Sequence, residues 1–103
     1  MTHYQALGPI TDYLVKNYSP EKIIVFGSCA RRAVRPHSDI DLCLVLPAAD
    51  KRQLRAEIGR GLMELIDYDV DLIIMTPEEW ERDAYRSGTF AGLIREKGVV
   101  LYG

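Results

Sequence analysis

The amino-acid sequence predicts an α/β (α+β) fold, a small mixed β-sheet with helices mainly on one face. Short runs of β-branched and aromatic residues alternate with amphipathic helical segments, and turn or capping residues stand between them. The resulting order is α-β-α-β-α-β-α-α-β. A chain of 103 residues with a hydrophobic fraction of 48% is expected to form one domain, residues 1–103.

The first segment, residues 3–18, carries apolar side chains at helical spacing. Proline is comfortable in a first turn but costly in a helix interior, and Pro9 stands well inside this segment. We therefore expect a firm helix over residues 9–17, preceded by an irregular or separate first turn.

The next segment holds the most informative stretch of the chain. Residues 22–26 and 40–46 are two apolar runs typical of buried strands. Gly27 follows the first run and permits a sharp turn and the close approach of a ligand. Ser28 is expected to N-cap a short helix over residues 29–32, whose free backbone amides favour a phosphate.

Two aspartates stand at the start of the second strand. Alternate side chains of a strand share a face, so Asp39 and Asp41 are expected to point the same way, roughly 7 Å apart. Neighbouring carboxylates repel each other unless a cation lies between them. Mg²⁺ suits this arrangement, because it binds one or two carboxylates together with phosphate oxygens.

A third aspartate follows in the next β-segment. Asp50 is expected to cap a helix over residues 51–66, and residues 70–75 form a third apolar strand with one charge, Asp71. An unpaired carboxylate is costly to bury. Asp71 therefore either faces solvent on an edge strand or joins Asp39 and Asp41 in a cluster of three carboxylates.

The C-terminal part is predicted to contain two helices and a short strand. The sequence from Thr76 begins with a cap, a proline and two acids, which is typical of a helix start. This helix, residues 77–86, is expected to turn Trp80 and Tyr85 inward. A helix over residues 90–96 and a strand over 99–102 complete the chain.

If the three aspartates share the open face of the sheet, four apolar side chains share it too: Cys43, Val45, Ile73 and Met75. An apolar patch of this kind is seldom left in contact with water. We expect a partner protein or a second copy of the chain to cover it, giving a possible homodimer. The alternative is that the C-terminal segment folds over the patch.

Composition excludes several classes of protein. The net charge of −2 argues against dedicated nucleic-acid binding, which normally requires a basic face. The sequence contains neither a run of eighteen apolar residues nor a signal-peptide pattern, so no membrane association and a cytoplasmic location are expected. Cys29 and Cys43 lack metal-ligand spacing and are expected to be free thiols.

The order Gly27-Ser28, ten residues, then Asp39-Ile40-Asp41 resembles the signature of the minimal nucleotidyltransferases of the polymerase-β superfamily. With Asp71 and the flanking strands, the resemblance extends over roughly residues 22–75. It implies the polymerase-β-type nucleotidyltransferase fold. Arg31 matches the family's arginine position, whereas Arg32 stands where the family often has glycine.

This resemblance implies transfer of a nucleoside monophosphate, AMP from ATP, to a hydroxyl group. It assigns the triphosphate to Gly27, Ser28 and Arg31, and it assigns two Mg²⁺ ions and catalysis to Asp39, Asp41 and Asp71. It does not assign roles to the remaining polar side chains of the insert, Arg32, Arg35 and His37. If they have no function, they are ordinary solvated surface residues.

The sequence says less about the acceptor of the transferred group than about the nucleotide donor. The resemblance to short, stand-alone members suggests an antitoxin that adenylylates a tyrosine of a helical HEPN ribonuclease toxin. One alternative is a small-molecule nucleotidyltransferase, acting on an aminoglycoside-like acceptor, that works as a dimer. Another is a non-catalytic antitoxin that blocks its partner sterically.

Overall fold

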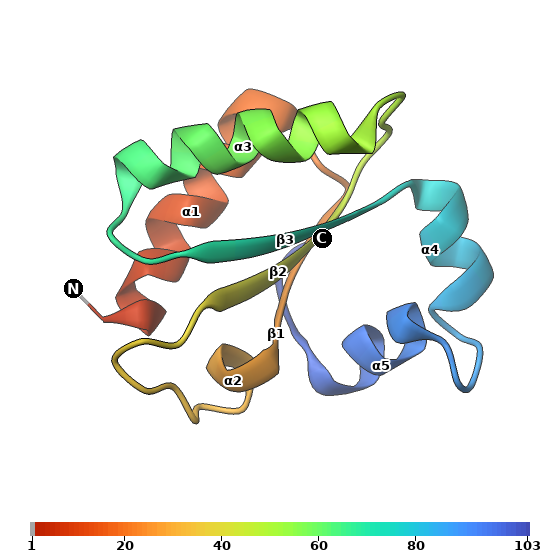
Figure 1. Cartoon of the computed structure of the whole chain (residues 1–103). Helices are drawn as coiled ribbons and strands as arrows, with labels where there is room; N and C mark the ends of the chain where they lie inside the picture. Colours follow the sequence, from red (N-terminus) through yellow and green to blue (C-terminus); the bar gives the residue numbers. More distant parts are fainter. Residues whose placement is uncertain (1) are drawn as a thin grey trace.

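The computed structural model describes residues 2–103, and its elements follow the predicted order (Figure 1). The helices in this range are α1 (His3–Tyr18), α2 (Gly27–Ala30), α3 (Lys51–Leu65), α4 (Pro77–Asp83) and α5 (Phe90–Lys97). The strands are β1 (Lys22–Phe26), β2 (Ile40–Val45), β3 (Val70–Met75) and β4 (Val99–Tyr102). None of these helices is long and apolar enough to cross a membrane.

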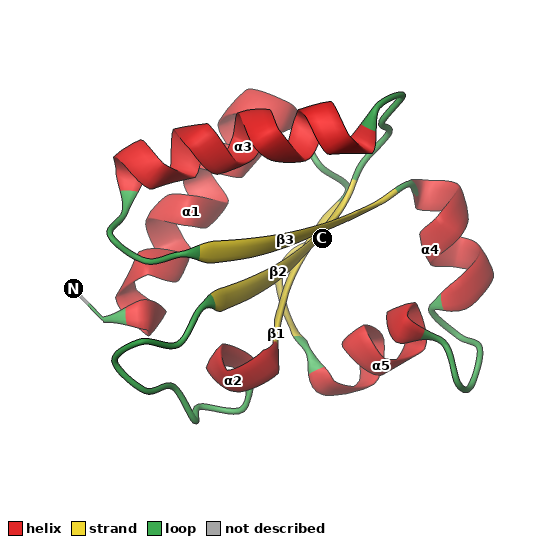
Figure 2. Cartoon of the chain, in the orientation of Figure 1, coloured by secondary structure: helices red, strands yellow, loops and turns green. Residues whose placement is uncertain are grey.

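The four strands form one mixed sheet in the order β3-β2-β1-β4. Figure 2 labels three of these strands, β3, β2 and β1, and shows helices on both sides of them. Strand β1 pairs antiparallel with both β2 and β4. Strand β3 pairs parallel with β2, because helix α3 connects the two strands as a crossover. The predicted fold class, a small mixed sheet within an α+β fold, is confirmed.

The two long helices, α1 and α3, cover one face of the sheet (Figure 1). Alternate strand residues point to this face, as a period of two requires. These strand residues and the apolar sides of α1 and α3 together form the larger hydrophobic core. Its fully buried large side chains include Ile10 and Leu14 of α1, Ile23 of β1, Leu42 of β2, and Ile58 and Leu62 of α3.

The shorter helices α4 and α5 lie on the opposite face (Figure 1). The helices therefore cover both faces of the sheet, and the expectation that they lie mainly on one face is wrong. Here they pack on the apolar patch, and Trp80 is only 6% exposed. Cys43 and Val45 are fully buried beneath them. The expectation that a partner or a second copy covers this patch is therefore wrong, because the C-terminal segment of the same chain packs on it, burying Cys43 and Val45 and covering Ile73 and Met75 in part. The predicted inward orientation of Trp80 is confirmed.

Helix α1 is continuous from His3 to Tyr18, so the expected irregular first turn is wrong. A capping box fixes its start: the Gln5 N–H donates to Thr2 Oγ1 at 3.1 Å, and the Thr2 N–H donates to Gln5 Oε1 at 2.8 Å. Burial of His3 and Ala6 adds packing that holds this first turn. Pro9 is accommodated inside the helix because these contacts offset its missing hydrogen bond.

Two further boundaries differ from the prediction. Helix α2 begins at Gly27 directly after β1, so Ser28 lies inside its first turn and does not cap it. Helix α4 ends at Asp83, short of the predicted end at residue 86, and Tyr85 is 76% exposed instead of turned inward. The predicted caps at Asp50 and Thr76 are confirmed by their hydrogen bonds to the N–H groups of Gln53 and Glu79.

Candidate active site

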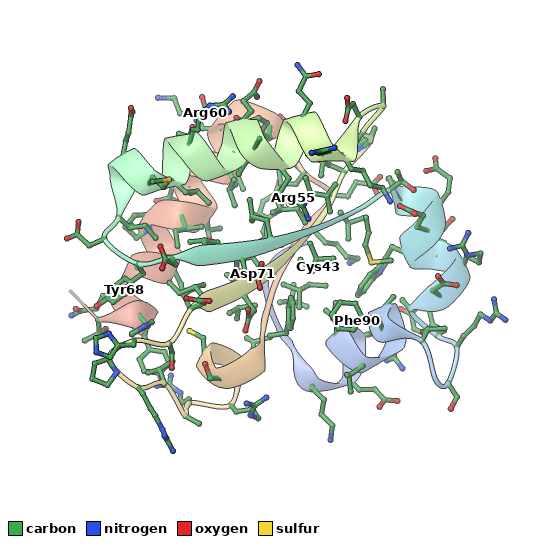
Figure 3. All side chains as sticks on the ribbon, viewed as in Figure 1. Cys43, Arg55, Arg60, Tyr68, Asp71 and Phe90 are labelled. Carbon is green, nitrogen blue, oxygen red and sulfur yellow. The ribbon has the colours of Figure 1, made fainter. Side chains whose placement is uncertain are left out.

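The carboxylates that sequence analysis singled out lie together at one end of the sheet. Asp41 in β2 is directly paired with Asp71 in β3, and Asp39 stands two residues before Asp41. Because paired residues on neighbouring strands share a face, Asp41 and Asp71 point to the same side of the sheet. Asp71 lies on the side of the sheet where α5 is found (Figure 3). The predicted shared face is confirmed for Asp41 and Asp71, whereas Asp39 precedes the first residue of β2, Ile40, so the strand pairing does not test its predicted place on this face.

The three carboxylates create a locally unfavourable electrostatic environment. Burial raises the pKa of Asp41, and the neighbouring charges of Asp71 and Asp39 raise that pKa further, while Arg31 opposes the shift. Within residues 2–103, no hydrogen bond or ion pair involves any of these three carboxylates. Negative charge is therefore concentrated here without a protein cation bound to it.

This concentration of charge is suited to a cation that arrives with its own ligands. Among the described residues, no three acidic, histidine or cysteine side chains converge closely enough to hold a metal ion by themselves. Mg²⁺ does not require such a cage, since it usually binds one or two carboxylates with phosphate oxygens and water. The carboxylates fit Mg²⁺ bound together with a nucleotide better than a resident protein-bound metal.

Gly27, which directly follows β1, lies close to the carboxylate of Asp41. Its φ of +69° lies in the left-handed region, where residues with a Cβ are disfavoured. A Cβ atom built on Gly27 would collide with the carboxylate oxygen Oδ2 of Asp41. Glycine therefore has two roles here: it turns the chain into α2, and it allows the backbone to approach Asp41.

Ser28 and Arg31 follow within the same short segment. The Ser28 side chain is half-buried, and its hydroxyl makes no hydrogen bond to the described residues. Arg31 ends α2, where its backbone N–H donates to the Gly27 carbonyl at 3.2 Å. The positive charge of Arg31 lowers the pKa of Asp41, in opposition to the effects of burial and of the other two carboxylates. Both side chains are thus available to a bound anion.

The loop between α2 and β2 contains the other polar residues of the insert. Arg32 has a φ of +55°, which explains physically why a glycine would suit this position. Its guanidinium lies 4.9 Å from the centre of the Tyr4 ring. Arg35 and His37 are exposed. The structure therefore ties Arg32 to α1 and gives neither Arg35 nor His37 a contact that indicates a role.

Sequence analysis missed His3, which anchors the loop just before Asp39. His3 is 5% exposed, and its Nε2 lies 2.7 Å from the Ser38 carbonyl oxygen, to which it donates. Its ring stacks on Tyr68, with the ring centres 4.1 Å apart. No local sequence pattern indicates this contact, because His3 and Ser38 are 35 positions apart.

A cavity of about 590 Å³ lies at the β3 edge of the sheet. Asp39 and Asp71 line it together with Tyr68, and helix α3 contributes Arg60 and Met63. Figure 3 shows Arg60 on α3 and Asp71 on β3. The cavity provides space for a second reactant beside two of the three carboxylates.

Comparison with known proteins gives a consistent result. The family model described as polymerase beta, nucleotidyltransferase matches residues 9–102. A crystal structure of a toxin–antitoxin with AMP-PNP has a TM-score of 0.70 at 23% identity, covering 94% of this chain and 73% of that one. The structure of tri-AMPylated Shewanella oneidensis HEPN toxin in complex with MNT antitoxin has a TM-score of 0.63 at 22% identity, covering 99% and 73%. Comparison with curated proteins gave no match. At these identities the structural likeness concerns the fold.

Proposed function

This chain belongs to the polymerase beta nucleotidyltransferase family, and from that premise we propose that it transfers AMP from ATP to a hydroxyl group. One observation carries the proposal. Asp41 and Asp71 are paired in register, Asp39 stands beside them, and Gly27 brings the backbone against Asp41. A row of unpaired carboxylates next to a close backbone approach supports a site for a metal-bound polyphosphate.

Each residue has a distinct part in the proposed reaction. Gly27 and Ser28 hold the triphosphate, and Arg31 adds a positive charge beside it. Asp39 and Asp41 would hold two Mg²⁺ ions, with Asp71 completing the ligands on the acceptor side. When bound, Mg²⁺ supplies positive charge that stabilises the attacking and leaving oxygens.

We assign the acceptor side of the reaction to Asp71. It is exposed and lines the 590 Å³ cavity. In the proposed step, the acceptor oxygen bonds to the α-phosphorus of ATP, pyrophosphate leaves, and the hydroxyl proton passes to the Asp71 carboxylate. The rate would arise from positioning and electrostatics, as in other phosphoryl transfers.

We propose a tyrosine of a helical HEPN toxin as the acceptor, so that the chain acts as an antitoxin. The support is that the two structures described above are a toxin–antitoxin and an MNT antitoxin in complex with a HEPN toxin, and that this HEPN toxin is AMPylated. The cavity beside Asp39 and Asp71 offers room for an inserted acceptor side chain. Dimeric action on a small molecule and purely steric inhibition are the competing outcomes of the test.

The test is a label-transfer experiment. The purified chain is mixed with Mg²⁺, α-labelled ATP and a HEPN protein encoded beside it, with the Asp39→Asn/Asp41→Asn variant as control. We expect label on the HEPN protein with wild type and none with the variant. A stable complex without label would contradict the proposed transfer and favour steric inhibition. In a parallel reaction that contains an aminoglycoside, label on the aminoglycoside but not on protein would favour the small-molecule alternative.

A further inference from the structure

Asp71 and Asp41 form a row across two neighbouring strands, and an aromatic residue continues this row on the other side of Asp41. Phe26, the last residue of β1, is directly paired with Asp41, which is paired in turn with Asp71. The side chains of Phe26, Asp41 and Asp71 therefore share one face of three adjacent strands. Gly27 comes immediately after Phe26. An apolar ring thus stands beside the part of the site that we assign to the triphosphate.

A second ring meets Phe26 from helix α5. The Phe90 and Phe26 ring centres are 5.8 Å apart, and their planes are inclined by 89°, which is an edge-to-face contact. Phe90 nevertheless remains 53% exposed. An edge-to-face contact uses at most one face of a ring, so Phe90 keeps a face for another planar group. Figure 3 shows Phe90 on the side of the sheet where Asp71 lies.

Helix α5 does not need Phe90 to stay in place. Ala91 and Ile94 are at most 2% exposed and anchor the helix in the smaller core. Thr89 caps its start by accepting a hydrogen bond from the Gly92 N–H at 3.0 Å. The exposed ring of Phe90 is therefore not explained by the stability of α5.

We propose that the nucleobase of the substrate stacks on Phe90, with Phe26 supporting the ring from the sheet. This inference rests on the proposed function, because it takes the triphosphate to lie at Gly27 and Ser28. A single ribose separates the base from the α-phosphate, so the base must lie near the face that carries Asp41. Phe90 is the exposed ring that contacts Phe26, and Phe26 is the residue paired with Asp41.

Stacking on an aromatic ring has a consequence for nucleotide choice. Every base has a π-face, so stacking tolerates different bases, and larger ring systems offer more contact area. We therefore expect ATP and GTP to bind with similar affinity, and CTP and UTP more weakly.

The test compares two ligands that share a polyphosphate but differ in the base. Isothermal titration calorimetry in Mg²⁺ gives the Kd of ATP and of inorganic tripolyphosphate for wild type and variants of the full chain. Phe90→Leu removes the ring but keeps an apolar side chain, and Phe90→Trp restores an aromatic face. Leu93→Ala is the matched control, since Leu93 is 52% exposed on the same helix but faces the 86–89 turn.

We expect Phe90→Leu to raise the Kd of ATP by about fivefold to a hundredfold, the range typical of one lost base stack, and to leave tripolyphosphate binding unchanged. Phe90→Trp and Leu93→Ala should bind ATP as wild type does. An unchanged ATP affinity in Phe90→Leu would overturn the base site but leave the proposed function standing. Equal weakening of both ligands would also overturn it, since that result indicates a displaced helix. If wild type binds neither ligand, the proposed function and this inference fail together.

Discussion

Gly27 combines a backbone conformation that favours glycine with a close contact to Asp41. Its φ is +69°, and any Cβ would collide with the Asp41 carboxylate. We predict that Gly27→Ala destabilises the chain by about 1–2 kcal/mol from the left-handed backbone alone and also greatly reduces transfer. Urea unfolding and the label-transfer assay measure the two effects.

Gly88 provides a matched control for this prediction. Its φ is +82°, but a Cβ there would meet nothing within 4 Å. Gly88→Ala should therefore show a similar loss of stability without a loss of transfer. If Gly27→Ala behaved like Gly88→Ala in both assays, the close approach to Asp41 would have no functional meaning.

The Asp41 carboxylate is expected to be required for transfer but to lower the stability of the folded chain. Burial and the charges of Asp71 and Asp39 raise its pKa, so the ionised carboxylate is less favourable in the folded chain than in the unfolded one. We predict that Asp41→Asn raises the melting temperature while lowering transfer by about a hundredfold or more. Differential scanning calorimetry and label transfer test this pair of effects.

The pH dependence of this stabilisation follows from the direction of the pKa shift. Because the folded pKa is raised, the folded chain holds the proton more strongly than the unfolded chain, whose carboxylate has an ordinary pKa of 3.8. The advantage of Asp41→Asn should therefore be largest at neutral pH, above the raised pKa, and should vanish below pH 3.8. A difference in melting temperature that grew on acidification would contradict the assignment.

Among the elements, helix α4 stabilises the fold by covering the apolar part of one sheet face. Trp80, 6% exposed, closes the apolar end of the face that carries the carboxylates. We predict that Trp80→Ala lowers the free energy of unfolding by about 3–5 kcal/mol, because it leaves a cavity over Cys43 and Val45. Urea unfolding measures the loss, and binding of a hydrophobic dye should increase as the patch is exposed.

Tyr85, which lies just beyond the end of α4, is the exposed aromatic control for Trp80. It is 76% exposed, and its ring lies 4.6 Å from the Arg95 guanidinium. Tyr85→Ala should cost less than about 1 kcal/mol, the value of an exposed cation–π contact. A loss as large as that of Trp80→Ala would mean that α4 does not carry the cover of this face.

Across the whole molecule, partner binding and chemistry are expected to be separable. The patch that would have required a partner is covered by α4 and α5, so a partner is not needed to complete the fold. We predict that the Asp39→Asn/Asp41→Asn variant binds the HEPN protein proposed above as its partner with an unchanged Kd but does not silence the ribonuclease. Calorimetry and a ribonuclease assay on the complex test this. Full inhibition by the variant would contradict the proposed transfer and favour steric inhibition.

Much of this protein is determined by local sequence. The element order, the strand over residues 70–75 and the caps at Asp50 and Thr76 follow from short-range periodicity and from side chains that bond their own helix. The spacing from Gly27 to Asp41 also indicated the candidate site, because its proposed residues are contained largely in one turn and two strand ends. Where two local signals conflicted, as at Pro9, sequence analysis chose wrongly.

Only the tertiary structure decided the contacts between distant segments. The register that pairs Asp41 with Asp71, the anchoring of Ser38 by His3, and the meeting of Phe26 with Phe90 each join residues at least thirty positions apart. The cover of the apolar patch by α4 and α5 is of the same kind. The physical reason is that periodicity tells which side of an element is apolar, whereas the partner of that side depends on how all the elements pack together.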